Sequence, residues 1–202
     1  MTSQNQSLTF KNRKRILTIP NLLTFIRILS IPFIVWLLRH PMAPSEQHLF
    51  WAACIFGLSF ITDQIDGIIA RATNQITQLG KIMDPLADKI LVVTALMLLV
   101  HIHFLAVWIA IVLSCRELIV NALRALAQSE GITLSPNWVG KTKAYFEGFG
   151  IGFVMLGPDQ HFLGFNWYNI GMNLLYLAVI TALFSAAQYF RIYFVESNKQ
   201  ES

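Results

Sequence analysis

The sequence predicts an all-α integral membrane protein with six transmembrane helices and both termini in the cytoplasm. Of its 202 residues, 55% are hydrophobic and only 13% are charged, whereas a typical soluble domain carries about 25% charged residues. Six apolar stretches approach the length of roughly 20 residues that crosses about 30 Å of hydrocarbon, and together they take up most of the chain. One membrane domain is therefore expected, at residues 19–193, without a soluble second domain.

The distribution of lysine and arginine sets the expected orientation. Cytoplasmic flanks of membrane spans are enriched in these residues, and all 15 except Arg39 lie on or toward the side that six spans assign to the cytoplasm. Residues 1–18 are polar and basic and lack the apolar core of a signal peptide, so a cytoplasmic amino-terminal segment is expected, with a cytoplasmic tail at 194–202. The basic cluster at 11–15 adjoins a span, which favours anionic membrane lipids over nucleic acid as its partner.

The first span, residues 20–38, begins with Pro20, whose fixed φ and missing N–H suit the first turn of a helix. Its polar start contains Asn21, Thr24 and Arg27. An arginine inside a span either extends its side chain to the headgroups or faces a functional site. Both interpretations stay open for Arg27.

Carboxylates gather where the second and third spans, residues 48–71 and 81–100, meet the polar cytoplasmic connection 72–79. The four acids are Asp63, Asp66, Asp84 and Asp88. In helices the first two are spaced i,i+3 and the last two i,i+4, so each pair projects from one face. Acids at the ends of spans are costly and indicate function, although solvated loop acids are the simpler alternative.

A metal site explains why four carboxylates converge. They cannot all stay ionised near one another in a low-dielectric setting unless cations neutralise them, and hard oxygen ligands select Mg²⁺ or Mn²⁺. We therefore predict two divalent ions. The expected ligands are Asp63, Asp66, Asp84 and Asp88. The small residues Gly67, Ala70 and Gly80 leave space beside the metals, and Arg71 offers a planar fork for phosphate oxygens.

The fourth span, residues 104–128, holds more polar groups than a lipid-facing helix tolerates. Glu117, Asn121 and Arg124 are spaced i, i+4 and i+7, and Arg116 lies on an adjoining strip, so the group is expected to face the bundle interior. One interpretation is a buried ion pair between Glu117 and an arginine that locks helices together. We expect both uses, with Glu117 orienting the arginines while they bind an anion.

The fifth span, residues 138–156, has Lys141 and Lys143 near its start. The amino-terminal end of a helix favours anions, but lysines that flank a span also serve as topology anchors, and both possibilities stay open. An exterior loop at 157–165 and a sixth span at 168–190 complete the predicted fold.

The motif at residues 63–88 matches D-x2-D-G-x2-A-R-x8-G-x3-D-x3-D at every fixed position. It resembles the signature of the CDP-alcohol phosphatidyltransferase family, and eight fixed positions at fixed spacing are far beyond chance for a chain of this length. The resemblance implies transfer of a phosphatidyl group from CDP-diacylglycerol to the hydroxyl of a small alcohol, with release of CMP. It further implies a homodimer in the inner (cytoplasmic) membrane, with the active site facing the cytoplasm.

The resemblance also implies roles for individual residues. Asp88 would be the catalytic base that accepts the proton of the acceptor's hydroxyl, besides being a metal ligand. The residues expected to bind CDP-diacylglycerol are Asn21, Gly67, Ala70, Arg71 and Gly80.

Positive charge outside the signature indicates a phosphorylated acceptor. The cations of the fourth and fifth spans exceed what a neutral alcohol or a zwitterion requires, so glycerol 3-phosphate is the simplest candidate. The residues expected to bind it are Thr24, Arg27, Arg116, Arg124, Lys141 and Lys143. Phosphatidylglycerol and inositol phosphate remain alternative acceptors. A cation-coupled transporter is a distant alternative, because acids are absent from the exterior halves of the spans.

Overall fold

The computed structural model describes six segments of the backbone, and side chains in most of them. The described residues are 19–39, 44–73, 78–132, 138–159, 161–162 and 164–200, and among these the side chains of 19–23, 64–73, 78–82, 84–85, 161–162 and 198–200 are not described.

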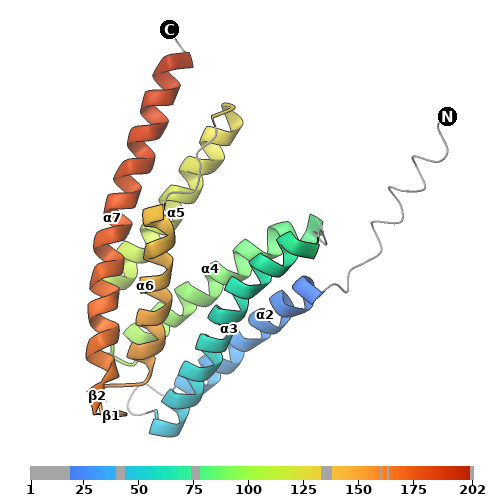
Figure 1. Ribbon diagram of the computed structural model, residues 1–202. Coiled ribbons are helices and arrows are strands. Elements are labelled where there is room, and N and C mark those ends of the chain that lie inside the picture. Colours follow the sequence, from blue (N-terminus) through green and yellow to red (C-terminus); the bar gives the residue numbers. More distant parts are fainter. Residues whose placement is uncertain are drawn as a thin grey trace, which may run out of the picture.

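The described residues form six helices and one short hairpin, which confirms the all-α class (Figure 1). The helices are α2 (Ile19–Leu38), α3 (Glu46–Thr73), α4 (Gln78–His101), α5 (Val107–Ser129), α6 (Trp138–Met155) and α7 (Trp167–Gln200). The strands β1 (His161–Phe162) and β2 (Phe165–Asn166) pair antiparallel between α6 and α7. This hairpin occupies the expected exterior loop, where Gly164 adopts a φ of 76°.

The helix bounds lie close to the six predicted spans, with one clear difference. The helix α7 continues past Arg191 to Gln200, through much of the segment predicted as a tail. Neither glycine nor proline follows Phe190, so nothing in the sequence stops the helix there. In addition, the Tyr193 hydroxyl donates a hydrogen bond of 3.0 Å to Glu130 beyond the end of α5, which holds this extension against its neighbour.

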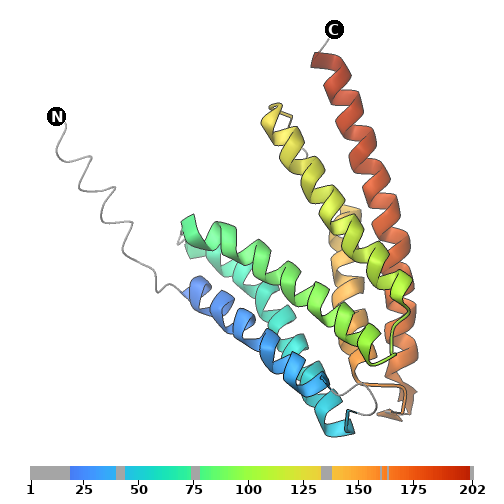
Figure 2. The same ribbon diagram turned by 180° about the vertical axis from the view of Figure 1, so that it is seen from behind.

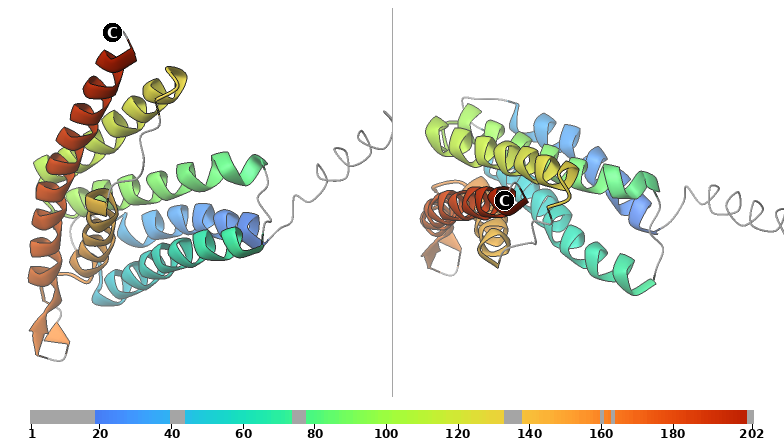
Figure 3. Two further views of the ribbon diagram at one scale, coloured as in Figure 1. Left: turned by 45° about the horizontal axis from the view of Figure 1, so that its top comes forward. Right: turned by 90° about the horizontal axis from the view of Figure 1, so that it is seen from above.

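The helices form two groups of three that meet near the hairpin and diverge toward their other ends (Figures 1 and 2). One group contains α2, α3 and α4, and the other contains α5, α6 and α7. The two groups touch where α3 and α4 contact α6 and where α4 contacts α5. In the view from above, α5 lies in front of α4, while α2 and α3 extend away from α6 and α7 (Figure 3). One continuous apolar core joins them, and it includes Phe56, Leu96, Ile109, Ile151 and Leu175.

Glycines allow α6 and α7 to pack with their backbones close together. A Cβ on Gly171 would lie 2.7 Å from the backbone nitrogen of Val154, and one on Gly150 would lie 2.9 Å from the side chain of Leu175. Such small-residue contacts are typical of helix pairs in membranes, where close backbone approach supplies the attraction. This pair is the most extensive helix contact in the structure.

By length and composition, one helix among the described residues is suited to crossing a membrane, at Trp167–Ser197, and a shorter apolar helix lies at Thr24–Leu38. Charged residues explain why α6 does not qualify, since its 18 residues include Lys141, Lys143 and Glu147. The arrangement of six spans therefore stays a prediction.

Candidate active site

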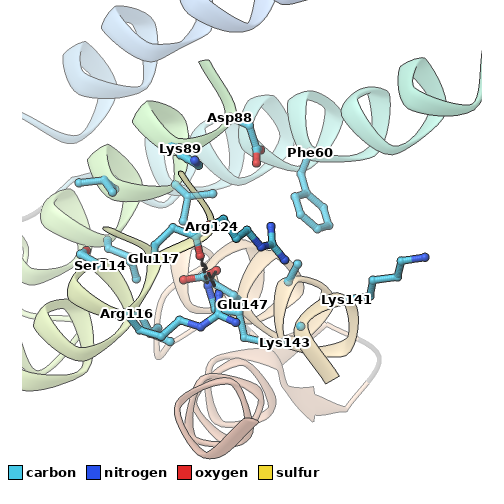
Figure 4. A pocket seen from close by; sticks show the side chains of 16 residues that line it. Phe60, Asp88, Lys89, Ser114, Arg116, Glu117, Arg124, Lys141, Lys143 and Glu147 are labelled. Atoms are coloured by element: carbon cyan, nitrogen blue, oxygen red, sulfur yellow. Dashed lines mark hydrogen bonds and ion pairs between the residues drawn. The ribbon is translucent and has the colours of Figure 1, made fainter. Parts of the chain in front are cut away.

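A cavity of about 270 Å³ opens where α3, α4, α5 and α6 meet. Figure 4 shows its lining side chains, most of the charged ones directed toward its centre. The charged residues are Asp88, Lys89, Arg116, Glu117, Arg124, Lys141, Lys143 and Glu147. Five of these eight are cationic and three are acidic, so the cavity has a net positive charge and suits an anion. Phe60, Leu96 and Leu113 contribute an apolar part of the wall.

Asp88 lines this cavity on α4, on the side opposite Arg116 and Lys143 (Figure 4). The described part of the chain directs no hydrogen bond or ion pair to its carboxylate. A partly buried carboxylate without a partner is costly, which indicates that this group is kept for a ligand or a proton. The last residue of the signature therefore shares one cavity with four of the five cations predicted to bind the acceptor.

Asp63 is not among the lining residues and forms an ion pair between α3 and α2. Its Oδ1 is 2.8 Å from Nη1 of Arg27, whose side chain is only 2% exposed. A hydrogen bond of 3.2 Å from Ser59 to Ser30 holds the same two helices together. Arg27 thus contacts the aspartate motif and is not among the residues that line the cavity. Thr24, which is buried on α2, is not a lining residue either.

Lys143 bridges two carboxylates on the wall of the cavity. Its Nζ donates hydrogen bonds to Glu117 at 3.1 Å and to Glu147 at 2.5 Å, and Lys143 and Glu147 are both buried. Glu147 is not among the site residues predicted from the sequence. The i,i+4 spacing from Lys143 inside an apolar stretch is a signal that could have identified it, because such a pair meets on one helix face.

Two arginines of α5 are held by hydroxyl groups of α7. Arg116 donates a hydrogen bond from Nη2 to Ser185 Oγ at 2.9 Å and another from Nη1 to Glu117 at 3.1 Å. Arg124 donates to the Tyr189 hydroxyl, and its guanidinium carbon lies 4.7 Å from the centroid of the same ring. Sequence reasoning missed both hydroxyls, because serine and tyrosine in an apolar helix carry no recognisable spacing signal.

Lys141 is an exposed cation of the cavity, as is Arg124. The Nζ of Lys141 lies 5.2 Å from the centroid of the Trp138 ring. Figure 4 shows its side chain extending away from the group around Glu117. Lys141 therefore lies at the rim, where a soluble anion would enter.

Part of the predicted site lies outside the described side chains. These residues are Asn21, Asp66, Gly67, Ala70, Arg71, Gly80 and Asp84. Among the described residues no group of three or more histidine, cysteine or acidic side chains gathers around a point. The predicted metal cluster needs Asp66 and Asp84 and so remains a prediction.

Comparison with known proteins identifies the family of the chain. The family profile described as CDP-alcohol phosphatidyltransferase matches residues 17–184. The chain belongs to this family. A relative from Shigella flexneri serotype 5b (strain 8401) is 34% identical over 177 residues, which cover 85% of this chain and 92% of the relative. A relative from Escherichia coli (strain K12) has the same identity and coverage. Both are named CDP-diacylglycerol–glycerol-3-phosphate 3-phosphatidyltransferase.

Membership of the CDP-alcohol phosphatidyltransferase family confirms the resemblance that the 63–88 motif indicated. The matched region runs from α2 to about the middle of α7 and so includes every helix that lines the cavity. The signature falls on α3 and α4, whereas the lining cations other than Lys89 fall on α5 and α6. The cavity therefore joins a part defined by the signature with a part that the signature does not specify.

Proposed function

We propose that this chain transfers the phosphatidyl group of CDP-diacylglycerol to glycerol 3-phosphate, giving phosphatidylglycerophosphate and CMP. The observation that carries the proposal is the single cavity in which Asp88 of the signature meets Arg116, Arg124, Lys141 and Lys143. A family member that uses an uncharged alcohol has no need for so many cations around the acceptor. The names of the two relatives support the same acceptor.

The chemistry follows from the opposite positions of acid and cations in the cavity. The guanidinium and ammonium groups bind the phosphate of the acceptor and hold its free hydroxyl toward Asp88. Asp88 accepts the hydroxyl proton as the oxygen attacks the phosphorus of the phosphatidyl group. A new P–O bond forms, the bond to the CMP oxygen breaks, and CMP leaves with the bonding electrons. Holding both reactants in one orientation supplies much of the acceleration.

The carboxylates of the signature fit a hard divalent cation. We propose Mg²⁺ or Mn²⁺ as the cofactor, in two sites formed by Asp63, Asp66, Asp84 and Asp88. The Asp88 carboxylate, which has no partner among the described residues, and the oxygen-only donor set agree with such an ion. Arg27 balances the charge of Asp63. The bound ions supply positive charge to the pyrophosphate of the donor. The residues proposed to bind that donor are Asn21, Gly67, Ala70, Arg71 and Gly80.

The proposed reaction is tested with purified protein, CDP-diacylglycerol and Mg²⁺, by measuring CMP release with one acceptor at a time. We expect release with glycerol 3-phosphate and much less with inositol 1-phosphate, phosphatidylglycerol or glycerol. Glycerol is the matched control, because it lacks only the phosphate that the cations would bind. A higher rate with phosphatidylglycerol would instead favour a cardiolipin synthase, and a higher rate with inositol 1-phosphate would favour an inositol-phosphate transferase.

We also propose that all six helices span the inner (cytoplasmic) membrane, in a homodimer whose active site faces the cytoplasm. Large apolar side chains are exposed on the outer faces of the helices, among them Phe33 and Trp36 on α2, Trp51 on α3 and Phe184 on α7. Such faces require lipid or a partner, because soluble proteins rarely expose large apolar patches. Consecutive helices run in opposite directions, so the ends predicted as exterior gather near the hairpin (Figures 1 and 2).

Cysteine labelling tests this topology. Cys54 and Cys115 are free and are first replaced by serine. In that background, Ser129→Cys at the end of α5 is expected to react only from the cytoplasmic side, and Asp159→Cys, between α6 and β1, only from the exterior. Both side chains are exposed, so a membrane-impermeant maleimide reaches each from its own side. Labelling of both from one side would contradict the six-span arrangement.

A further inference from the structure

The helix α7 supports the cavity without lining it. None of its described residues belongs to the wall, yet two of its hydroxyl groups accept hydrogen bonds from arginines that do. Ser185 accepts from Arg116, and Tyr189 accepts from Arg124. Ser185 is 0% and Tyr189 is 1% exposed. The contact of Ser185 with the buried Arg116 is closed to water, whereas Arg124, the partner of Tyr189, is itself exposed.

The two contacts repeat along one seam between α5 and α7. Ser185 and Tyr189 are spaced i,i+4 and share a face of α7. A glycine of α6 adjoins the same seam, since a Cβ on Gly140 would lie 3.5 Å from Ser185 Oγ and 3.9 Å from the Tyr189 hydroxyl. Residue 140 therefore lies beside both hydroxyls, where three helices meet around the two arginines.

One donor of Arg116 has no partner in these contacts. In Arg116, Nη1 is engaged with Glu117 and Nη2 with Ser185, while Nε is buried and has no hydrogen-bond partner among the described residues. A buried donor without a partner costs stability, which is offset when an anion binds it. The guanidinium is also already oriented, and a fixed side chain loses less freedom on binding.

We infer that Ser185 and Tyr189 are positioning residues that set the affinity for the acceptor's phosphate by orienting Arg116 and Arg124. The inference rests on the proposed function, because it assigns the arginines to a phosphorylated acceptor. Neither hydroxyl touches the reacting atoms. Each hydroxyl acts through an arginine that binds the acceptor. Loss of a hydroxyl is therefore expected to change the Michaelis constant for the acceptor more than it changes kcat.

The chain offers a matched pair of tyrosines for the test. Tyr189 and Tyr193 are one turn apart on α7, and each hydroxyl contacts a residue of the α5 region. The partner of Tyr189 lines the cavity, whereas the partner of Tyr193, Glu130, does not. Tyr189→Phe is expected to raise the KM for glycerol 3-phosphate about two- to tenfold, with kcat and the KM for CDP-diacylglycerol nearly unchanged. Tyr193→Phe is expected to change none of the three constants.

A double-mutant cycle separates positioning from general support. If Tyr189 acts through Arg124, Tyr189→Phe has no further effect on the KM for glycerol 3-phosphate in an Arg124→Ala background. Any of three results overturns the inference. Tyr189→Phe could have an equal effect in both backgrounds, or change kcat and both Michaelis constants alike. It could also lower the Tm while leaving the KM for glycerol 3-phosphate unchanged.

Serine at 185 provides a second, independent test with a rescue. Ser185→Ala removes one oxygen and is expected to raise the same KM, whereas Ser185→Thr retains a hydroxyl and is expected to restore it toward the wild-type value. Failure of both Ser185→Ala and Tyr189→Phe to change this KM also overturns the inference. If the wild-type protein does not use glycerol 3-phosphate at all, the proposed function itself is refuted, and the inference with it.

Discussion

Asp88→Asn is expected to lower kcat by about 10²- to 10⁴-fold, the range that general base catalysis contributes. Asparagine keeps the shape of the side chain but can neither accept the hydroxyl proton nor supply the charge that a divalent ion requires. Asp88 receives no hydrogen bond or ion pair from the described residues, so its replacement breaks no contact described there. The Tm in detergent is therefore expected to stay near the wild-type value while CMP release is nearly lost.

Asp159→Asn is the matched control for this result. Asp159 is exposed in the connection before β1, remote from the cavity lining, and its replacement is expected to leave turnover unchanged. Chelation with EDTA is expected to abolish turnover of the wild-type protein, and added Mg²⁺ or Mn²⁺ to restore it. Full activity of Asp88→Asn would refute the role of Asp88 as base, and activity in excess chelator would refute the proposed metal dependence.

The positions of the helices could be predicted from the sequence because they depend on local features. Apolar runs of fixed length and the proline at the start of α2 placed most helix ends within a few residues. The end of α7 is the exception, because the predicted sixth span stops at 190, whereas the helix continues to Gln200. A helix can continue beyond the membrane when nothing breaks it, and the hydrogen bond between Tyr193 and Glu130 is a tertiary contact that a single sequence does not reveal.

The candidate site could be predicted only in part, for a related reason. Spacing along one helix indicates which side chains share a face, so the strip of Arg116, Glu117 and Arg124 was identified. Spacing does not indicate which helix lies opposite. The contact of Arg116 with Ser185 joins residues 69 positions apart, and the pairing of Arg27 with Asp63 depends on how α2 packs against α3. These contacts decide which cations face the cavity and which serve as counter-ions.

Lys141 and Lys143 are expected to respond very differently to removal, although they are two residues apart. Lys141→Ala is expected to raise the KM for glycerol 3-phosphate by roughly tenfold to 150-fold, because a charge-assisted contact to a phosphate contributes about 1.5–3 kcal/mol. Its Tm is expected to stay unchanged, since Lys141 is exposed and binds no carboxylate among the described residues. Arg191→Ala is the matched control, because Arg191 is also an exposed cation on the same predicted side of the membrane but does not line the cavity.

Lys143→Ala is expected to lower the Tm as well as the acceptor affinity. Removal of the Lys143 ammonium leaves the buried Glu147 without its partner at 2.5 Å and also takes one partner from Glu117. A buried charge that loses its partner costs about 3–5 kcal/mol of stability. Melting curves and Michaelis constants of the two variants distinguish the roles. If Lys141→Ala weakens CDP-diacylglycerol as much as glycerol 3-phosphate, the rim cation binds the shared donor, and the cavity no longer explains the choice of a phosphorylated acceptor.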